Sequence, residues 1–139
     1  MRKLLLIIFV SLGLIGCSTT PPSQNEIKNV PMDRVFSYQN NDSSNIIVVR
    51  DKGIVGSACF INFFINGKES AKLETKERAS FYVPSGEIIL GASLEGRGLC
   101  SFNAPRRERS FILKVGDVRY FRLSIDPNGN TDIMPTTLY

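Results

Sequence analysis

The sequence predicts an all-β fold: a single small antiparallel β-sandwich, or a small barrel, that follows a signal peptide and a flexible tether. Three observations lead to this prediction. Short runs rich in β-branched and aromatic residues are separated by turn residues about every 8 to 12 positions. Apolar residues within these runs recur with a period of two. Beyond the N-terminal apolar segment, no stretch shows the 3.6-residue period of an amphipathic helix.

The first residues have the composition of a secretory signal. Arg2 and Lys3 form a positive start, and residues 4–15 are almost entirely apolar. The run covers roughly a dozen positions, whereas a membrane-spanning helix needs about 20, so we expect a cleaved signal and not an uncleaved anchor helix. The expected organisation is a signal peptide over residues 1–16, a lipidated Cys17 and flexible tether over 17–34, and one β-sandwich domain over 35–139.

The apolar segment ends in Leu14-Ile15-Gly16-Cys17 and opens onto a polar, proline-containing stretch. This pattern resembles the lipobox of bacterial lipoproteins. The resemblance implies that Cys17 becomes the first residue of the mature chain, with a diacylglyceryl thioether on its thiol and an acyl group on its new amino group. Each buried methylene contributes about 0.8 kcal/mol, so several acyl chains together hold a protein on a membrane essentially permanently.

The residue after the Cys bears on location in such lipoproteins. Asp at that position commonly retains a lipoprotein in the inner membrane, and here the position is Ser18. The resemblance therefore implies a protein that is lipid-anchored in the cell outer membrane and faces the periplasm. The inner membrane is the less favoured alternative, and a Gram-positive host would change this expectation.

Cys59 and Cys100 remain once Cys17 is assigned to the lipid. An exported compartment is oxidising, so the simplest expectation for an even pair is a disulfide. It would close a loop of about 40 residues and stabilise the fold by roughly 4 kcal/mol. A metal pair and a nucleophilic thiol are the alternatives. Both lack supporting ligands, because the chain contains no His.

Turn signals divide the rest of the chain into short strands. Asn66-Gly67 is the strongest hairpin signal, and Gly116-Asp117 is expected to join its two flanking strands in a second hairpin. The expected strands span residues 46–50, 58–65, 68–73, 78–83, 87–94, 99–102, 109–115, 118–125 and 131–134, with 35–38 either a further strand or a segment packed on the domain.

The period of two assigns faces to these strands. Phe60, Phe64 and Ile112 are apolar exceptions on otherwise polar faces. Phe60 and Phe64 could join Tyr82 in a partly exposed apolar face for a partner, or could cover a second sheet face. The residues expected to point into the core are Cys59, Ile61, Phe63, Ile65, Ile88, Leu90, Ala92, Leu94, Phe111, Leu113, Val115, Phe121, Leu123 and Ile125.

The order of turns over residues 46–125 is also similar to a known layout. A strand reaches Asn66-Gly67-Lys68, a short return follows, and Phe81-Tyr82-Val83-Pro84-Ser85-Gly86 precedes another apolar strand. Together with residues 111–123, this resembles the PEGA-like domains and the small bacterial lipoproteins of the DUF2846 family. The resemblance implies a β-sandwich in an extracytoplasmic setting, without a known catalytic activity.

Charge and composition bear on the class of function. Without Arg2 and Lys3, the 17 basic residues fall to 15, against 13 acidic ones, a side-chain net charge of +2. This excess gives no reason to expect a nucleic-acid partner. The absence of His rules out Ser-His-Asp and Cys-His catalysis and most zinc sites. We expect no catalytic residues, no metal and no cofactor. A hydrolase that uses carboxylates alone, with Glu74 and Glu77 the closest pair, is the remaining enzyme alternative.

Arg106, Arg107 and Arg109 form the one local concentration of charge. Arginines offer bidentate contacts to carboxylates and phosphates, so these three are the candidate partner-binding residues. The alternative is an exposed loop and strand start that charge keeps soluble.

The sequence thus predicts a lipid-anchored cell-envelope lipoprotein whose β-sandwich faces the periplasm as a non-enzymatic binding or structural module. Its expected partners are the membrane, through the lipid on Cys17, and an envelope protein or cell-wall component. The alternative is an inhibitor or immunity protein acting on a cell-wall-degrading enzyme, with residues 96–109 as the loop that enters the active site.

Overall fold

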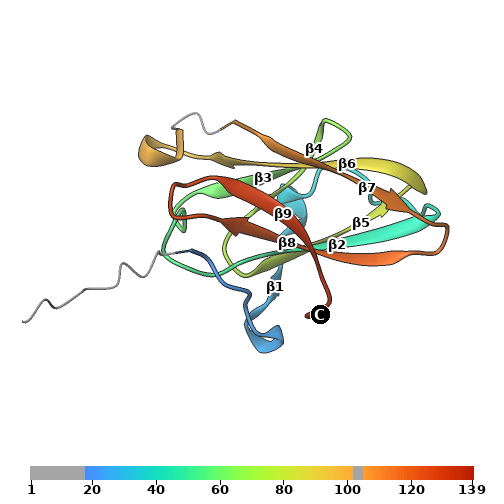
Figure 1. Cartoon of the computed structure of the whole chain (residues 1–139), viewed down its shortest axis with the longest axis horizontal. Coiled ribbons are helices and arrows are strands. Elements are labelled where there is room, and N and C mark those ends of the chain that lie inside the picture. The colour runs from blue at the N-terminus through green and yellow to red at the C-terminus, as the bar shows by residue number, and fades with distance from the viewer. Residues whose placement is uncertain (1–17, 102–104) are drawn as a thin grey trace, which may run out of the picture.

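Two β-sheets pack face to face in the computed structural model, which describes residues 18–101 and 105–139 (Figure 1). Cys17 and the signal segment lie outside these residues. The two sheets are not closed into a barrel, so the predicted small β-sandwich is confirmed. The first sheet contains, in order, β1 (Lys28–Asn29), β5 (Glu77–Val83), β2 (Ser44–Arg50), β8 (Val118–Ile125) and β9 (Thr131–Thr136); the second contains β4 (Lys68–Leu73), β3 (Phe60–Ile65), β6 (Gly86–Glu95) and β7 (Arg107–Leu113).

The core lies between the inner faces of the two sheets. Alternate apolar residues of each strand point inward, as the period of two predicts. Aromatic rings join the layers: the centroids of Phe63 on β3 and Phe81 on β5 are 5.4 Å apart, and those of Phe111 on β7 and Phe121 on β8 are 4.8 Å apart. The fully buried core residues include Ile46, Val48, Ile61, Phe63, Ile65, Leu73, Phe81, Leu90, Ala92, Phe121, Leu123 and Ile133.

The hairpin predicted at Asn66-Gly67 is confirmed. It joins the antiparallel strands β3 and β4. Asn66 and Gly67 have φ angles of 48° and 78°, the left-handed conformation that a two-residue hairpin turn requires and that these two residue types adopt at least cost.

The second predicted hairpin, around Gly116-Asp117, is wrong. The turn itself forms, with the Asp117 amide donating to the Lys114 carbonyl at 3.0 Å. However, β7 pairs with β6, whereas β8 pairs with β2 and β9. The chain therefore crosses from one sheet to the other at this turn. Val115, expected to point into the core, lies in the turn and is 78% exposed.

The strand predicted over 99–102 is also wrong. Residues Gly98–Ser101 form a short 3-10 helix, η3. Gly96 and Gly98, with φ angles of 152° and 62°, turn the chain away from the sheet after β6. Cys100 faces the start of β3 from this helix instead of extending a strand.

The segment expected as a flexible tether lies against the domain. Thr20 forms a β-bridge with Lys52, β1 runs parallel to the start of β5, and Val35 bridges to Ala71. Val30 is only 6% exposed. The prolines and polar residues of this segment show no hydrophobic periodicity in the sequence. Pairing through backbone N–H and C=O groups at a sheet edge does not require such a pattern. The described fold therefore begins at residue 18 and not at 35. This segment also contains the 3-10 helices η1 (Gln24–Glu26) and η2 (Met32–Arg34).

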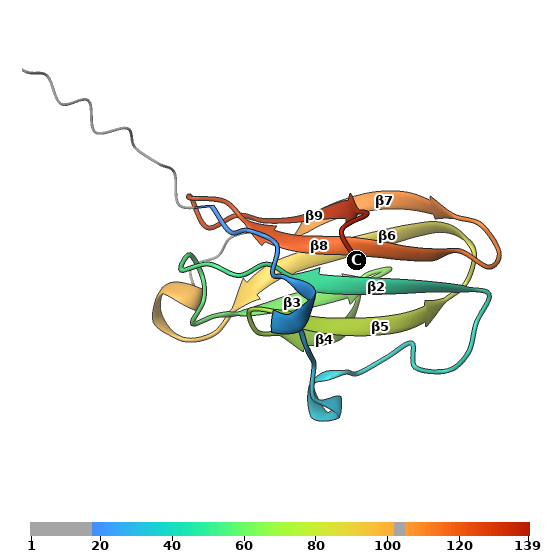
Figure 2. The same ribbon diagram turned by 90° about the horizontal axis from the view of Figure 1, so that it is seen from below.

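Strand directions place the connections at two opposite ends of the sandwich. β2, β4, β6 and β8 finish, and β3, β5, β7 and β9 begin, at one end. Figure 2 shows the start of the described chain at this end, where the β2–β3 connection, η3 and the β8–β9 turn also lie. We call it the Thr19 end; it comprises residues 18–20, 51–59, 74–76, 96–101, 105–106 and 126–130. The opposite, far end carries residues 84–85 and 114–117.

Candidate functional site

The chain enters the domain at a fixed point, Thr19. This residue is 7% exposed. Its amide donates to the Ile125 carbonyl at 3.2 Å, and its hydroxyl oxygen accepts from the Ile125 amide at 2.9 Å. The same hydroxyl donates to Oδ2 of Asp51 at 3.0 Å. Ser18 alone therefore separates Cys17 from a residue that is held by the fold.

Asp51, whose carboxylate accepts the hydrogen bond from Thr19, is itself held in place. Asp51 is 1% exposed. Arg122 on β8 donates to it through two nitrogens, from Nε to Oδ1 at 3.0 Å and from Nη2 to Oδ2 at 2.5 Å. The hydrogen bond that Arg122 donates to Asp51 raises the pKa of Arg122. A buried charge is tolerable only when it is paired and hydrogen-bonded. Arg122 therefore holds the Asp51 carboxylate in a fixed position, where it accepts the hydrogen bond from Thr19.

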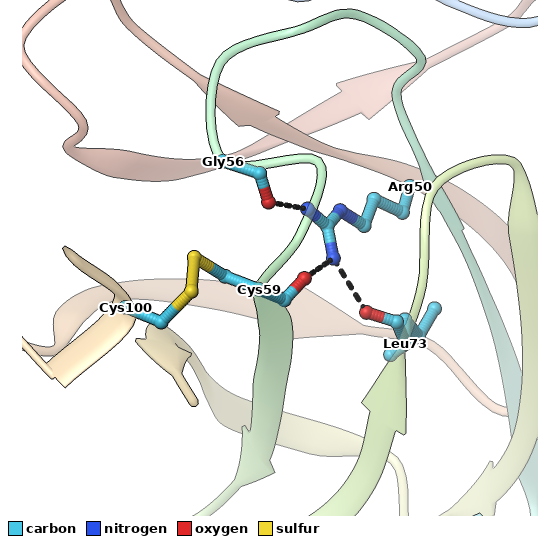
Figure 3. Close-up of a disulfide and its surroundings, with 5 residues drawn as sticks. All are labelled: Arg50, Gly56, Cys59, Leu73 and Cys100. Carbon is cyan, nitrogen blue, oxygen red and sulfur yellow. Dashed lines mark hydrogen bonds between the residues drawn. A yellow bond between two sulfur atoms is a disulfide. The ribbon is translucent and has the colours of Figure 1, made fainter. Parts of the chain in front are cut away.

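Arg50, at the end of β2, holds the neighbouring loop from inside. Its guanidinium is 1% exposed and donates to the carbonyls of Cys59 at 2.6 Å, Leu73 at 2.7 Å and Gly56 at 2.7 Å (Figure 3). Burial lowers its pKa to about 10, so the side chain remains charged at neutral pH. Three main-chain carbonyls from the β2–β3 connection and the end of β4 are thereby satisfied by one side chain.

The predicted disulfide between Cys59 and Cys100 is confirmed. The two Cα atoms are 5.3 Å apart, across a separation of 41 residues (Figure 3). Gly96 permits this approach, because a Cβ there would lie 2.7 Å from the Cβ of Cys100. The bridge ties η3 to the start of β3 and leaves Leu99 on the outside, 87% exposed.

The three arginines of the predicted cluster, Arg106, Arg107 and Arg109, differ in their contacts within the domain. Arg109 is engaged by Asp132 on β9, with Nε 2.7 Å from Oδ1 and Nη2 2.8 Å from Oδ2. Arg106 lies over the ring of Phe64 at 4.1 Å and 3.7 Å from the carboxylate of Glu108. Both side chains are therefore used within the domain.

Arg107 differs from its neighbours. It is exposed and forms no ion pair within the described part of the chain. Its charge adds to the hydrogen bond from Arg109, the larger cause, in lowering the pKa of Asp132. Arg107 also borders a hollow of about 270 Å³ whose other walls include Ser18, Thr19 and Asn130. Of the three predicted residues, it is the one without an ion pair among the described residues, and it lies beside the chain entry.

The aromatic residues singled out in the sequence do not form a shared apolar face. Phe60 and Phe64 lie on the outer face of the second sheet, where the guanidiniums of Arg34 and Arg106 cover their rings at 5.3 and 4.1 Å. Tyr82 belongs to β5 in the other sheet. Phe60 and Phe64 thus cover part of a sheet face, and Tyr82 is separate from them.

Glu74 and Glu77, the carboxylate pair considered for catalysis, have different surroundings. Glu77 forms a bidentate ion pair with Arg34, at 2.8 and 2.7 Å, and accepts from the Glu74 amide at 2.7 Å. Glu74 is exposed. Glu77 therefore holds β5 to η2. Within residues 18–101 and 105–139, no group of three His, Cys, Asp or Glu side chains is placed to hold a metal ion.

The structure adds residues that sequence reasoning missed: Thr19, Arg50, Asp51 and Arg122. The one available signal was Arg50-Asp51, two charges directly after an apolar β-run. Charged residues there are most simply explained as the exposed end of a strand, so the pattern did not reveal their burial.

Comparisons with protein-family models, curated proteins and solved structures found no match to this chain. Among the described residues, no helix has the length and apolar character needed to span a membrane.

Proposed function

We propose that this protein is a lipid-anchored cell-envelope lipoprotein, held in the outer membrane by the lipid on Cys17, with a non-enzymatic β-sandwich that faces the periplasm. The observation that carries the proposal is the combination of Leu14-Ile15-Gly16-Cys17 with a domain that begins only two residues later, at the buried Thr19. The disulfide supports an oxidising, extracytoplasmic compartment.

The role of the domain is to bind or to organise other envelope components. The arrangement of its charged groups supports this role. Arg50, Asp51 and Glu77 are buried in contacts that hold loops and strand ends together. Acid–base catalysis needs a titratable group within reach of a substrate, and each of these three is turned inward.

An inhibitor or immunity protein for a wall-degrading enzyme is the second candidate. The observation that favours it is Leu99, which is 87% exposed on a loop fixed by the disulfide. A rigid loop loses little conformational entropy on entering an active site. Titrating the purified domain into a peptidoglycan hydrolase assay tests this candidate: stoichiometric inhibition that Leu99→Ala abolishes supports it, and unchanged turnover contradicts it.

The anchor is tested by comparing the wild-type chain with Cys17→Ala and with Ser18→Ala as the matched control. The wild type and Ser18→Ala should fractionate with the outer membrane and carry acyl mass on the peptide that begins at Cys17. Cys17→Ala should leave the membrane fraction. Membrane association of Cys17→Ala at the wild-type level, or a wild-type peptide without acyl mass, would contradict the proposal.

The binding role is tested by crosslinking the lipidated protein in cells and identifying what is attached. One recurrent envelope protein would support a binding module, and comparing Arg107→Glu with Lys114→Glu would show whether it binds at the Thr19 end or at the far end. Recovery of a wall hydrolase would support the inhibitor. Crosslinks without a recurrent partner would count against a tight protein partner.

A further inference from the structure

Only Ser18 lies between Cys17 and Thr19, so the connecting chain is too short to hold the domain away from a membrane. Consecutive Cα atoms are 3.8 Å apart, and extended chain spans about 3.3–3.6 Å per residue. The Cα of Cys17 can therefore lie no more than about 7 Å from the Cα of Thr19. Because Thr19 is bonded to Asp51 and Ile125, that limit applies to the domain itself. The headgroup layer has a comparable thickness, about 5–7 Å on each side of the bilayer.

Two apolar side chains project at the same end of the sandwich. Gly53 touches the entry point, since a Cβ there would lie 3.2 Å from the Cα of Thr19. The next residue, Ile54, is 88% exposed, and Leu99 on η3 is 87% exposed. Arg50 and the disulfide hold the two loops that carry these tips. Isolated exposed apolar residues need no explanation, but two on fixed loops at the end where the proposed lipid is attached suit an interfacial contact.

Two cations accompany them. Arg97 precedes η3 and Arg107 begins β7; both are exposed, and neither belongs to an ion pair among the described residues. Arg107 borders the hollow that Ser18 and Thr19 also line. Guanidinium groups form bidentate hydrogen bonds to phosphate oxygens. Basic residues beside apolar ones are the composition of surfaces that lie in a membrane interface.

We propose that the Thr19 end lies directly on the phospholipid surface that holds Cys17. In this orientation Ile54 and Leu99 enter the interface, and Arg97 and Arg107 contact lipid phosphates. The inference rests on the proposed lipid anchor. The occupant is the membrane itself, because the chain between the lipid and Thr19 is too short for another macromolecule to separate them. The far end, with the 78%-exposed Val115, is then presented to the periplasm.

The absence of Trp from the sequence gives a direct test. Single Trp residues are introduced as Ile54→Trp, Leu99→Trp and, as the far-end control, Val115→Trp. All three positions are exposed, so each variant should fold. The full-length lipidated proteins are reconstituted into vesicles of phosphatidylethanolamine and phosphatidylglycerol, some with brominated acyl chains. Trp at 54 and at 99 should show blue-shifted emission and quenching by the brominated lipid. Trp at 115 should emit as in water and remain unquenched.

The outcomes separate this inference from the anchor on which it rests. Failure of the wild type to float with vesicles, without acyl mass on Cys17, would overturn the proposed function. Flotation with unquenched Trp at 54 and 99, or with equal quenching at 115, would overturn the orientation alone. A Leu99→Trp protein that also carries Arg97→Glu and Arg107→Glu should lose quenching, whereas Lys114→Glu should leave it unchanged. Equal quenching in these two proteins would overturn the role given to the arginines.

Discussion

The hydroxyl of Thr19 donates a hydrogen bond to the buried carboxylate of Asp51, across 32 residues of sequence, at 3.0 Å. Asp51 is held by Arg122 on β8, and Thr19 also pairs with the backbone of Ile125, where β8 ends. One side chain therefore joins the chain entry to the ends of β2 and β8. If Cys17 carries lipid, this contact fixes the domain close to the membrane surface.

Thr19→Val keeps the shape of the side chain and removes the hydroxyl. The amide of Ile125 and the carboxylate of Asp51 would each lose a partner in a buried site, so we expect a loss of about 1–3 kcal/mol in the free energy of unfolding. Chemical denaturation of residues 18–139 measures it. Thr20→Val is the matched control: Thr20 is exposed and bonds through its backbone, so its effect should stay within about 0.5 kcal/mol. Equal effects would show that the hydroxyl of Thr19 contributes nothing.

Arg50→Met should be among the most destabilising single changes at the Thr19 end. It leaves the carbonyls of Cys59 and Leu73 without the Arg50 donor in a buried site, and each unsatisfied group costs about 1–3 kcal/mol. The Gly56 carbonyl keeps the Cys59 amide as a donor. We expect a loss of about 2–6 kcal/mol. Arg78→Met is the control, because the exposed side chain of Arg78 on β5 bonds to Asn29 alone among the described residues; it should cost less than about 1 kcal/mol.

Faster amide exchange over residues 53–58 in Arg50→Met than in Arg78→Met would assign the loss to the β2–β3 loop. Comparable stability of the two variants would contradict the role of Arg50. Arg50→Lys keeps a charge and three donors on a different geometry, so its stability should fall between those of the wild type and Arg50→Met.

Much of the fold could be predicted from short stretches of sequence. Alternation located the strands: the bounds expected at 68–73 and 118–125 are those of β4 and β8. Asn66-Gly67 defined its hairpin because its turn geometry needs two left-handed residues. The cysteine count, with the predicted export signal, identified the disulfide. Each of these inferences depends on a few adjacent residues or on residue type alone.

Which strands pair with each other could not be predicted from local sequence. Gly116-Asp117 reverses the chain, but a turn does not specify whether its flanking strands bond to each other. β8 instead pairs in parallel with β2, a strand that lies far from it in the sequence. That pairing depends on which apolar faces pack together, as Phe111 and Phe121 do from opposite sheets.

The candidate site was predicted only in part. The arginine cluster was found by charge, but side-chain direction separates its members: Arg109 reaches Asp132, Arg106 covers Phe64, and Arg107 remains exposed. The pair of the buried Asp51 and the half-buried Arg122 has no local signature, because its members are 71 residues apart.

The carboxyl of Glu26 should titrate far below its usual range. A hydrogen bond from Lys52 Nζ at 2.9 Å is the main cause, followed by the Ser23 amide at 2.8 Å, and together they lower its pKa from 4.5 to about 2. The ionised form is thus favoured in the folded state. Its stabilising effect is complete above about pH 4.5 and is lost as the pH falls towards 2. Carbon-detected NMR titration of the Glu26 carboxyl measures the midpoint.

Lys52→Met should raise that midpoint, although not fully to 4.5, because the Ser23 amide still donates. Lys28→Met is the control, since Lys28 is exposed and forms none of the ion pairs within the described part of the chain. It should leave the midpoint of Glu26 unchanged. A wild-type midpoint near 4.5, or the same shift in both variants, would show that Lys52 does not set the pKa.

Reduction of the Cys59–Cys100 bond should lower the free energy of unfolding by about 4 kcal/mol, because the bridge closes a loop across 41 residues and restricts the unfolded chain. Residues 18–139 contain no other cysteine, so denaturation with and without reductant isolates this bond. The double variant Cys59→Ser with Cys100→Ser should have the stability of the reduced protein and should not respond to reductant.

The loss should also be visible locally, since the bridge is what joins η3 to β3. Amide exchange over 98–101 should accelerate on reduction more than exchange in β4, an edge strand whose place is fixed by its pairing with β3. The change bears on the membrane orientation as well: without the bridge, Leu99→Trp should lose part of its quenching by brominated lipid, while Ile54→Trp, beside the entry point, should keep it. Unchanged stability on reduction would contradict the structural role of the disulfide, and unchanged quenching of both Trp residues would show that Leu99 reaches the lipid without it.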